Sequence, residues 1–349
     1  MFDGIKVQQL SIDIDLLLRS DLFTFPLLVD SKTSEILNRV RQSTYRGLTF
    51  SLVPKEIGLY KCELKGSLHK YSNGGVQNAN DFTAESLFNV INDLVSNLKI
   101  NIFCSRLNNV EFGVNITLPF PVSKILKSLI TYKNKPFTKS YDYKSQYYQC
   151  AFQQYIVKIY DKGKQYGLDS YTLRFEIKVV KMQFFIERGV SISSLADLLD
   201  ISQYDKLGSI LINTFKEILF DDFSVKAEGL KPKERELLLK GRNPRFWQLS
   251  EELLGKEYER ERKRLKRAER NFRQLLKTYS RSEDWVQLVT DLIMEKWQAI
   301  SSVLPDSKVL IRSKLVEWRT SQKTEKCPKL TSVLSKNLSE NNHIGLELF

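Results

Sequence analysis

Four short segments in the first half of the chain alternate between apolar and polar residues, and this period of two constrains the fold more than any other feature. They cover residues 59–65, 110–116, 157–162 and 173–179. Because successive side chains of a strand point to opposite faces, each segment predicts a strand with one apolar face and one charged face.

Segments with a helical spacing of apolar residues surround these strands. The clearest are 81–98 and 206–220, and 121–130 is a shorter candidate. Beyond Pro232 the pattern is helical throughout, whereas the end of the chain is rich in Ser, Lys and Asn. We therefore predict three parts. Residues 1–225 form an α+β domain whose antiparallel sheet is covered by helices on one face and open on its charged face, residues 226–319 form an all-helical region, and residues 320–349 form a disordered tail.

Positive charge is in excess and is concentrated in one helix. The 349 residues include 54 Lys and Arg against 41 Asp and Glu, a net charge of +13. Within residues 255–277 ten basic residues stand against four glutamates. Such clustering favours a polyanionic partner, although charge also serves solubility alone. Apolar residues at seven-residue spacing in the same helix could dock on the sheet domain or on a second copy, which would make a homodimer.

Several classes of protein are disfavoured. The four cysteines are far apart and form no C-x-x-C pair, which argues against a zinc knuckle or a dense disulfide framework and suits a reducing compartment. No signal peptide or membrane span is apparent, so we expect a cytoplasmic protein. Phosphate-binding glycine motifs of nucleotide-driven motors and dehydrogenases are absent.

The charged faces of the four strands collect residues that could act on a phosphodiester. They are Glu63, Glu111, Glu176, Lys158, Tyr160, Lys162 and Arg174, with His69 just after the first strand. Carboxylates with one histidine suit Mg²⁺ or Mn²⁺. A tyrosine with lysines two positions away on either side could serve as a nucleophile, because the cations favour the phenolate and hold the phosphate. Composition alone favours a solvated face with cross-strand ion pairs.

Short motifs at the same strands resemble the replication initiators of the filamentous-phage gene II type and related plasmid rolling-circle initiators. The resemblance covers about residues 45–225. It rests on the segments KCELKGSLHKY at 61–71, NDF at 80–82, NVEFG at 109–113, IYDKGK at 159–164 and LRFEIK at 173–178. It implies a permuted relative of the HUH endonuclease fold, which nicks one DNA strand at an origin and becomes linked to the 5′ phosphate through tyrosine.

The resemblance also implies roles for individual residues. It assigns Tyr160 as the nucleophile, Lys162 as its partner on the phosphate side and Glu111 as the strand acid, with Glu63 and His69 in the earlier metal motif. The paired histidines of better-known HUH enzymes are absent, which bears on the metal ligands more than on the nucleophile.

Two points stay open within this assignment. Glu176 corresponds to the acid of the Arg-Phe-Glu strand, where anchoring Arg174 and contacting the metal are equally compatible roles. Tyr155 and Tyr166 are alternative nucleophiles, although neither has lysines on both sides at strand spacing.

Two further basic segments are expected to contact DNA. In the first, aromatic residues interleave with Lys133, Lys135, Lys139 and Lys144, a pattern that suits unpaired bases and phosphates, or a charged loop whose aromatics fold back on the core. The Asn- and Gly-rich residues 72–80 are a similar candidate. The basic helix is expected to contact duplex phosphates or to recruit a partner helix, through Arg262, Lys263, Arg264, Lys266 and Arg267.

We predict a metal-dependent, origin-specific DNA endonuclease and strand transferase that starts rolling-circle replication of a phage, plasmid or integrated element. Its cofactor would be Mg²⁺ or Mn²⁺, and its partners origin DNA, single-stranded at the nick, with a host helicase and polymerase. The alternative is a non-enzymatic DNA-binding initiator or regulator. The enzyme requires Glu63, His69, Glu111 and Tyr160 to converge, whereas the binding protein does not.

Overall fold

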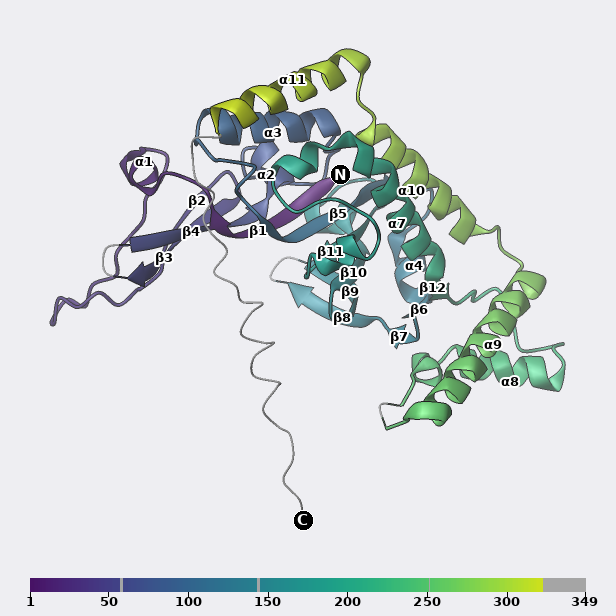
Figure 1. Ribbon diagram of the computed structural model, residues 1–349. Helices are drawn as coiled ribbons and strands as arrows, with labels where there is room; N and C mark the ends of the chain where they lie inside the picture. The colour runs from purple at the N-terminus through teal and green to yellow at the C-terminus, as the bar shows by residue number, and fades with distance from the viewer. Residues whose placement is uncertain (57–58, 143–144, 251, 323–349) are drawn as a thin grey trace, which may run out of the picture.

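A nine-stranded antiparallel sheet forms the centre of the molecule (Figure 1). The computed structural model describes residues 1–56, 59–142, 145–250 and 252–322. The strand order is β2-β3-β4-β1-β5-β11-β10-β9-β8. The strands are β1 (Phe2–Leu10), β2 (Arg41–Tyr45), β3 (Leu48–Glu56), β4 (Leu59–Ser67), β5 (Leu107–Thr117), β8 (Thr138–Asp142), β9 (Ser145–Ala151), β10 (Tyr155–Asp161) and β11 (Thr172–Val179). A small second sheet joins β12 (Ile218–Phe220), β6 (Leu129–Tyr132) and β7 (Lys135–Pro136).

All four alternating segments are strands of this sheet, as β4, β5, β10 and β11. Their apolar positions are buried, among them Cys62, Phe112 and Phe175. Lys162 is the exception to the predicted pattern. It is the first residue of α5 (Lys162–Tyr166) rather than a strand residue, because the Asp161 side chain accepts a hydrogen bond from the Lys164 amide and starts a helix there.

Helices cover the apolar face of the sheet, as predicted. The main ones are α7 (Tyr204–Glu217) and α10 (Trp285–Ser301), which cross each other where Gly208 leaves room for the Trp297 ring. Trp297 also packs edge-on against Phe112 of β5, with ring centroids 6.2 Å apart. The remaining helices that contribute to the main core are α1 (Ile14–Arg19), α2 (Leu68–Ser72), α3 (Ala84–Ser96), α4 (Val122–Ser128), α6 (Gln183–Ile186) and α11 (Pro305–Ser321), with 3₁₀ turns at Ala196–Leu199 and Ile201–Gln203.

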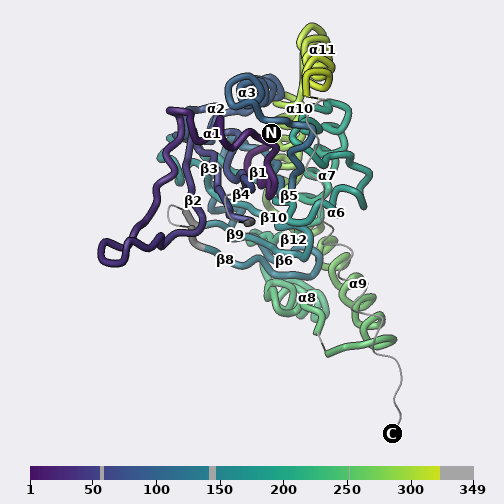
Figure 2. The backbone as a smooth tube through the Cα atoms, turned by 60° about the vertical axis from the view of Figure 1, so that its left-hand side comes forward, coloured from purple at the N-terminus to yellow at the C-terminus, as the bar shows by residue number. Residues whose placement is uncertain are grey.

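The helices after Pro232 divide between two hydrophobic cores. Helices α10 and α11 pack on the core of the large sheet, where Trp318 of α11 stacks on Phe88 of α3. Helices α8 (Pro232–Gly241) and α9 (Gly255–Tyr279), with the 3₁₀ turn Pro244–Trp247, enclose a separate core. This core is centred on Trp247, Leu265 and Phe272. The lobe that they form projects from the body beside the small sheet (Figures 1 and 2).

The predicted tail falls almost wholly beyond the described chain. Helix α11 continues through Ser321, two residues into the segment expected to be disordered, and residues 323–349 lie outside the described residues. No helix in the described part of the chain combines the length and apolarity that a membrane span requires.

The charged face is not open over β11, contrary to expectation. Arg174 and Glu176 of β11 are each only 2% exposed. The loop before α3 crosses the sheet at this point, because the Asn115 side chain on β5 donates hydrogen bonds to the backbone oxygens of residues 78–80 at 2.9–3.4 Å. Residues 72–80 are therefore partly a cover of the sheet, and not only the DNA-contacting loop that their composition suggested.

Replacing Gly113 with alanine is expected to destabilise the fold by about 2–3 kcal/mol through overpacking. A Cβ at this position would lie 2.2 Å from the Phe175 carbonyl oxygen and 2.6 Å from the Glu176 Cα, and both of these atoms belong to the backbone of the paired strand. Urea unfolding measures the loss. Gly189→Asn is the control, because nothing lies within 4 Å of Gly189 and asparagine tolerates its positive φ. Equal stability of Gly113→Ala and the unmodified protein would contradict this account of the strand contact.

Candidate active site

A polar cavity of about 390 Å³ lies on the charged face of the sheet. Its lining includes three carboxylates, six lysines and two tyrosines. They are Asp3, Glu111 and Glu176; Lys6, Lys65, Lys70, Lys158, Lys162 and Lys178; and Tyr160 and Tyr166. Because lysines outnumber carboxylates two to one, the cavity favours an anion such as a phosphodiester.

Strand register brings five of these residues together. Lys158 on β10 lies opposite Glu176 on β11, and Tyr160 lies opposite Arg174. On the other side of β11, Lys178 lies opposite Glu111 of β5. Directly opposed residues share a face in an antiparallel pair, so these side chains form three adjacent rows across three strands.

Two glycines make room for the carboxylates. A Cβ on Gly4 of β1 would lie 2.8 Å from the Glu111 carboxylate, and a Cβ on Gly113 would lie 2.6 Å from the Glu176 Cβ. Each glycine thus lets an acidic side chain lie across the neighbouring strand. Larger residues at either position would push a carboxylate out of place.

Arg174 is the buried hub of the site. Its Nε donates to Glu176 Oε2 at 2.9 Å, its Nη2 to Asp3 Oδ2 at 3.3 Å and its Nη1 to Asn115 Oδ1 at 3.3 Å. Burial acts to raise the pKa of both carboxyls. At Glu176 the charges of Lys158 and Arg174 outweigh burial and hold the pKa below its ordinary value. At Asp3 the charge of Arg174 and the Ser67 hydroxyl do the same. Both acids are therefore ionised at neutral pH.

Lys158 bridges the two remaining carboxylates. Its Nζ lies 3.5 Å from Glu111 Oε1 and 3.4 Å from Glu176 Oε1, while Lys178 Nζ lies 2.6 Å from the same Glu111 oxygen. Burial acts to lower the pKa of Lys158, but Glu176 and Glu111 raise it above its ordinary value. The lysine is a permanent cation in the wall of the cavity.

Lys162 lies between the two tyrosine rings of the cavity. Its Nζ is 5.4 Å from the ring centroid of Tyr160 and 4.9 Å from that of Tyr166, and it donates to Asn78 Oδ1 at 2.7 Å. The Tyr166 hydroxyl donates to the same oxygen at 2.7 Å.

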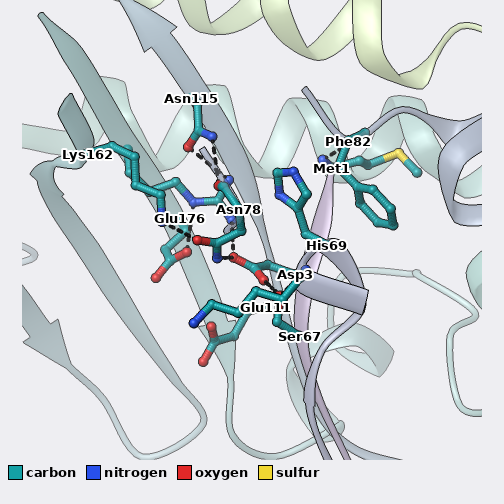
Figure 3. A network of polar contacts seen from close by, with 12 residues as sticks. Met1, Asp3, Ser67, His69, Asn78, Phe82, Glu111, Asn115, Lys162 and Glu176 are labelled. Carbon is teal, nitrogen blue, oxygen red and sulfur yellow. Dashed lines mark hydrogen bonds and ion pairs between the residues drawn. The ribbon is translucent and has the colours of Figure 1, made fainter. Parts of the chain in front are cut away.

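Asn78 links Lys162 to the hub. Its side chain donates to Asp3, so Asp3, Asn78 and Lys162 point toward one another (Figure 3). Burial, followed by the charge of Arg174, lowers the pKa of Lys162 to about 8.

The three candidate nucleophiles occupy different environments. Tyr155 is removed from the cavity, since its hydroxyl pairs with that of Tyr132 at 3.2 Å and its ring packs on Phe184. Tyr160 lines the cavity and is 8% exposed, and burial together with Glu176 raises its pKa well above the ordinary value. Tyr166 also lines the cavity, is more exposed, and has a pKa raised mainly by burial.

Two of the predicted metal ligands lie apart from the cavity. Glu63 is on the polar face of β4, where it forms an ion pair with Lys61 at 2.6 Å. His69 is buried in α2, with its Nε2 2.7 Å from Asn80 Oδ1 and its ring stacked on Phe82. Burial lowers the pKa of His69 to about 4, so the ring is neutral. The structure therefore brings Glu111 and Tyr160 to one cavity but leaves Glu63 and His69 outside its lining.

The carboxylates that do converge are not arranged as a metal site. Asp3, Glu111 and Glu176 each pair with a lysine or arginine. Among the residues that the structure describes, no group of three or more His, Cys, Asp or Glu side chains could hold a metal ion. As placed, these residues do not fit Mg²⁺ or Mn²⁺, and cations occupy the positions around the carboxylate oxygens.

Sequence reasoning missed Asp3 and Asn78, which connect the hub to Lys162. One signal was present for Asp3, an acid beside a glycine at the start of the apolar run 2–10. Nothing local marks Asn78, because its role depends on a loop crossing the sheet.

The first predicted DNA-binding segment is partly engaged within the protein. Lys133 pairs with Glu217 at 3.5 Å, and Lys135 donates to the Ala151 carbonyl oxygen at 2.5 Å. Lys139 lies on β8, and Lys144 lies outside the described residues. Phe137 packs against the main core. This agrees with the alternative prediction, in which the aromatic residues of this segment fold back on the core.

Replacing Arg174 with methionine is expected to cost about 3–5 kcal/mol at pH 7, because buried Asp3 would lose its ion pair and Glu176 would keep only Lys158. Without the guanidinium, burial would raise the pKa of Asp3 above that of the unfolded chain and would be opposed less strongly at Glu176. Protons would then bind the folded state preferentially, so the loss should shrink by about 1–2 kcal/mol at pH 5. Urea unfolding at both pH values measures this. Arg264→Met, which breaks an exposed pair with Glu261, should cost under about 1 kcal/mol.

Replacing Lys162 with methionine should change how stability depends on pH. Between the pKa of about 8 in the folded protein and the ordinary value of 10.5, the unfolded chain holds a proton that the folded protein has released. The unmodified protein therefore gains stability relative to the variant as pH rises, by about 2 kcal/mol from pH 7 to pH 10. Chemical unfolding across this range measures the difference. Lys164→Met, at an exposed position of the same helix, should show none; a flat difference for Lys162→Met would contradict the lowered pKa.

Comparison with known proteins adds little to this site. The sequence matches no protein-family model, and no curated protein is a significant match. Among solved structures, a rolling circle replication initiator protein from Geobacillus stearothermophilus is similar at 11% identity and a TM-score of 0.34. The match covers 76% of this chain and 95% of that one. Similarity at this level is too weak to establish a shared fold or activity.

Proposed function

We propose that the chain nicks one DNA strand at an origin by transferring the 5′ phosphate to Tyr160, and so starts rolling-circle replication. One observation carries the proposal. Two tyrosines contact a buried lysine inside a cavity where lysines outnumber carboxylates. Such a grouping would supply a nucleophile, a proton acceptor and phosphate-binding cations. The motif resemblance at β4, β5, β10 and β11 points to the same chemistry.

The reaction is a transesterification. The Tyr160 oxygen attacks phosphorus as the bond from phosphorus to the 3′ oxygen breaks, and the phenolic proton ends on that 3′ oxygen. Lys162 suits the transfer, because a pKa of about 8 leaves part of the amine neutral near physiological pH. Lys158 and Lys178 neutralise Glu111 and Glu176, which would otherwise repel the phosphate.

The raised pKa of Tyr160 bears on this step. Because burial and Glu176 disfavour the phenolate, the attack needs a proton acceptor close to the Tyr160 hydroxyl, and Lys162 is our candidate. The 3′-OH that is released would prime a host polymerase, with a host helicase separating the strands. We assign no ligand set to a divalent metal, because each carboxylate of the cavity is paired with a cation.

Tyr166 is the second candidate nucleophile. It is more exposed than Tyr160 and its hydroxyl is fixed by Asn78, which also orients Lys162. The two tyrosines can be separated by experiment, since each hydroxyl can be removed on its own by a change to phenylalanine.

The test uses a supercoiled plasmid that carries the DNA around the chain's own gene, incubated with Mg²⁺, with Mn²⁺ and with chelator. We expect a nicked plasmid and a protein–DNA adduct that survives SDS. Tyr160→Phe should remove the adduct. Tyr166→Phe should lower the yield of the adduct by no more than about tenfold, which is the effect of one lost hydrogen bond.

The opposite pattern, with the adduct lost only in Tyr166→Phe, would move the nucleophile to Tyr166. Binding without nick or adduct, on DNA shown to contain the origin, would favour the non-enzymatic initiator. Tyr155→Phe is the matched control, because it also removes one buried hydroxyl but lies outside the cavity.

A further inference from the structure

Helix α9 carries a continuous row of cations on its solvent side. Positions at alternating intervals of four and three residues share one face of a helix. Starting from the first turn of α9, these positions are Lys256, Arg260, Lys263, Arg267, Arg270, Gln274 and Lys277. Six of the seven are basic, none is acidic, and all seven are exposed. We call these residues the α9 stripe. At 1.5 Å per residue it is about 31 Å long.

The cations of the stripe have no acidic partner within the described residues, whereas the other arginines of the helix do. Arg262 pairs with Glu259 at 3.1 Å, Arg264 with Glu261 at 2.6 Å and Arg273 with Glu269 at 2.8 Å. Three of the four glutamates of α9 thus form ion pairs with arginines that do not belong to the stripe. Of the five residues predicted to contact DNA here, Lys263 and Arg267 belong to the stripe, Lys266 lies beside it, and Arg262 and Arg264 are on paired flanks.

The opposite side of the helix is occupied by the core of the lobe. Leu265, Phe272 and Leu275 are buried there, and the Phe272 ring fills the space left by Gly241 of α8. With its apolar face already buried, α9 cannot lie in a membrane interface, which requires that face to be free. For the same reason it cannot pair with a partner helix through its apolar seam.

We infer that the α9 stripe binds the phosphates of duplex DNA, as a surface distinct from the cavity on the sheet. A straight, rigid row of unpaired cations complements a rigid polyanion. The stripe contains no aromatic residue, so it lacks the stacking platforms with which proteins hold single strands. Gln274 is its sole amide, so it is suited to contact the backbone rather than to read base edges.

The proposal divides the DNA between two surfaces. The lobe would hold the double-stranded flank while the cavity acts on one unpaired strand. It goes beyond the proposed nicking activity and does not depend on it, since the stripe would bind duplex whether or not Tyr160 forms an adduct.

The experiment compares two triple variants of equal charge change in the full chain. The stripe variant is Arg260→Gln, Lys263→Gln and Arg267→Gln. The control variant is Lys240→Gln, Arg262→Gln and Arg264→Gln, which removes three cations of the same lobe that are in ion pairs. Fluorescence anisotropy with a labelled 20-base-pair duplex and with a single strand of the same sequence gives affinity as a function of salt.

We expect the stripe variant to lower the slope of log K against log salt for the duplex by about 2–3, because each lost phosphate contact contributes about 0.9. The control variant should change it by less than 1, and single-strand binding should change less than duplex binding in the stripe variant. Equal losses in the two variants would show a general effect of net charge and overturn the proposal. A larger loss for the single strand would also overturn it.

The outcome is separable from that of the nicking test. Adduct formation on a single-stranded origin oligonucleotide should be the same in the stripe variant and in the unmodified protein. If the stripe variant forms no adduct on this oligonucleotide, the stripe takes part in binding the single strand. That result would contradict the proposed division of duplex and single strand between two surfaces. Failure of Tyr160→Phe to remove the adduct would refute the assigned nucleophile and leave the duplex result unaffected.

Discussion

The buried ion pairs of Arg174 hold the functional face of this protein together. One guanidinium contacts Asp3 on β1, Asn115 on β5 and Glu176 on its own strand, so three strands share a single cation. An isolated buried charge is costly, and this cluster is tolerated because every member has a partner. The position of each other polar group follows from it. Glu176 places Lys158, Asp3 places Asn78, and Asn78 places Lys162 and Tyr166.

The site combines residues that stabilise the fold with residues that do not. Arg174 contributes to stability because it compensates two buried acids. Lys162 works in the other direction, since its lowered pKa means that the surroundings disfavour its charge. A buried lysine that the fold does not favour, located between two tyrosines, is typical of a residue retained for chemistry. The cations of the α9 stripe also do not stabilise the fold, because they repel one another and are exposed outside the core of the lobe.

Local patterns in the sequence predicted the sheet well, because the period of two fixes which side of a strand is buried. Val110, Phe112, Leu173 and Phe175 all face the core as the alternation required. The site was predicted less completely, since its assembly depends on long-range contacts. The pairing of β1 with β4 and β5 brings in Asp3, which only an acid beside a glycine marks in the sequence. A loop crossing brings in Asn78, which leaves no local signal. His69 was expected in the loop after the first motif strand, but it lies in a short helix, where its ring stacks on Phe82 outside the cavity lining.

Strand β1 lies inside the sheet between β4 and β5, and its Asp3 depends on an arginine far along the chain. During synthesis Asp3 must wait for Arg174 longer than β1 waits for its neighbouring strands, because the two residues are 171 positions apart in sequence. Until β11 has left the exit tunnel, the two acids and the arginine cannot neutralise one another, and no cavity exists. Folding of the sheet is therefore a late and cooperative event, slowed by the closure of long loops. In a nascent chain the polar cavity would form only when these strands are in place.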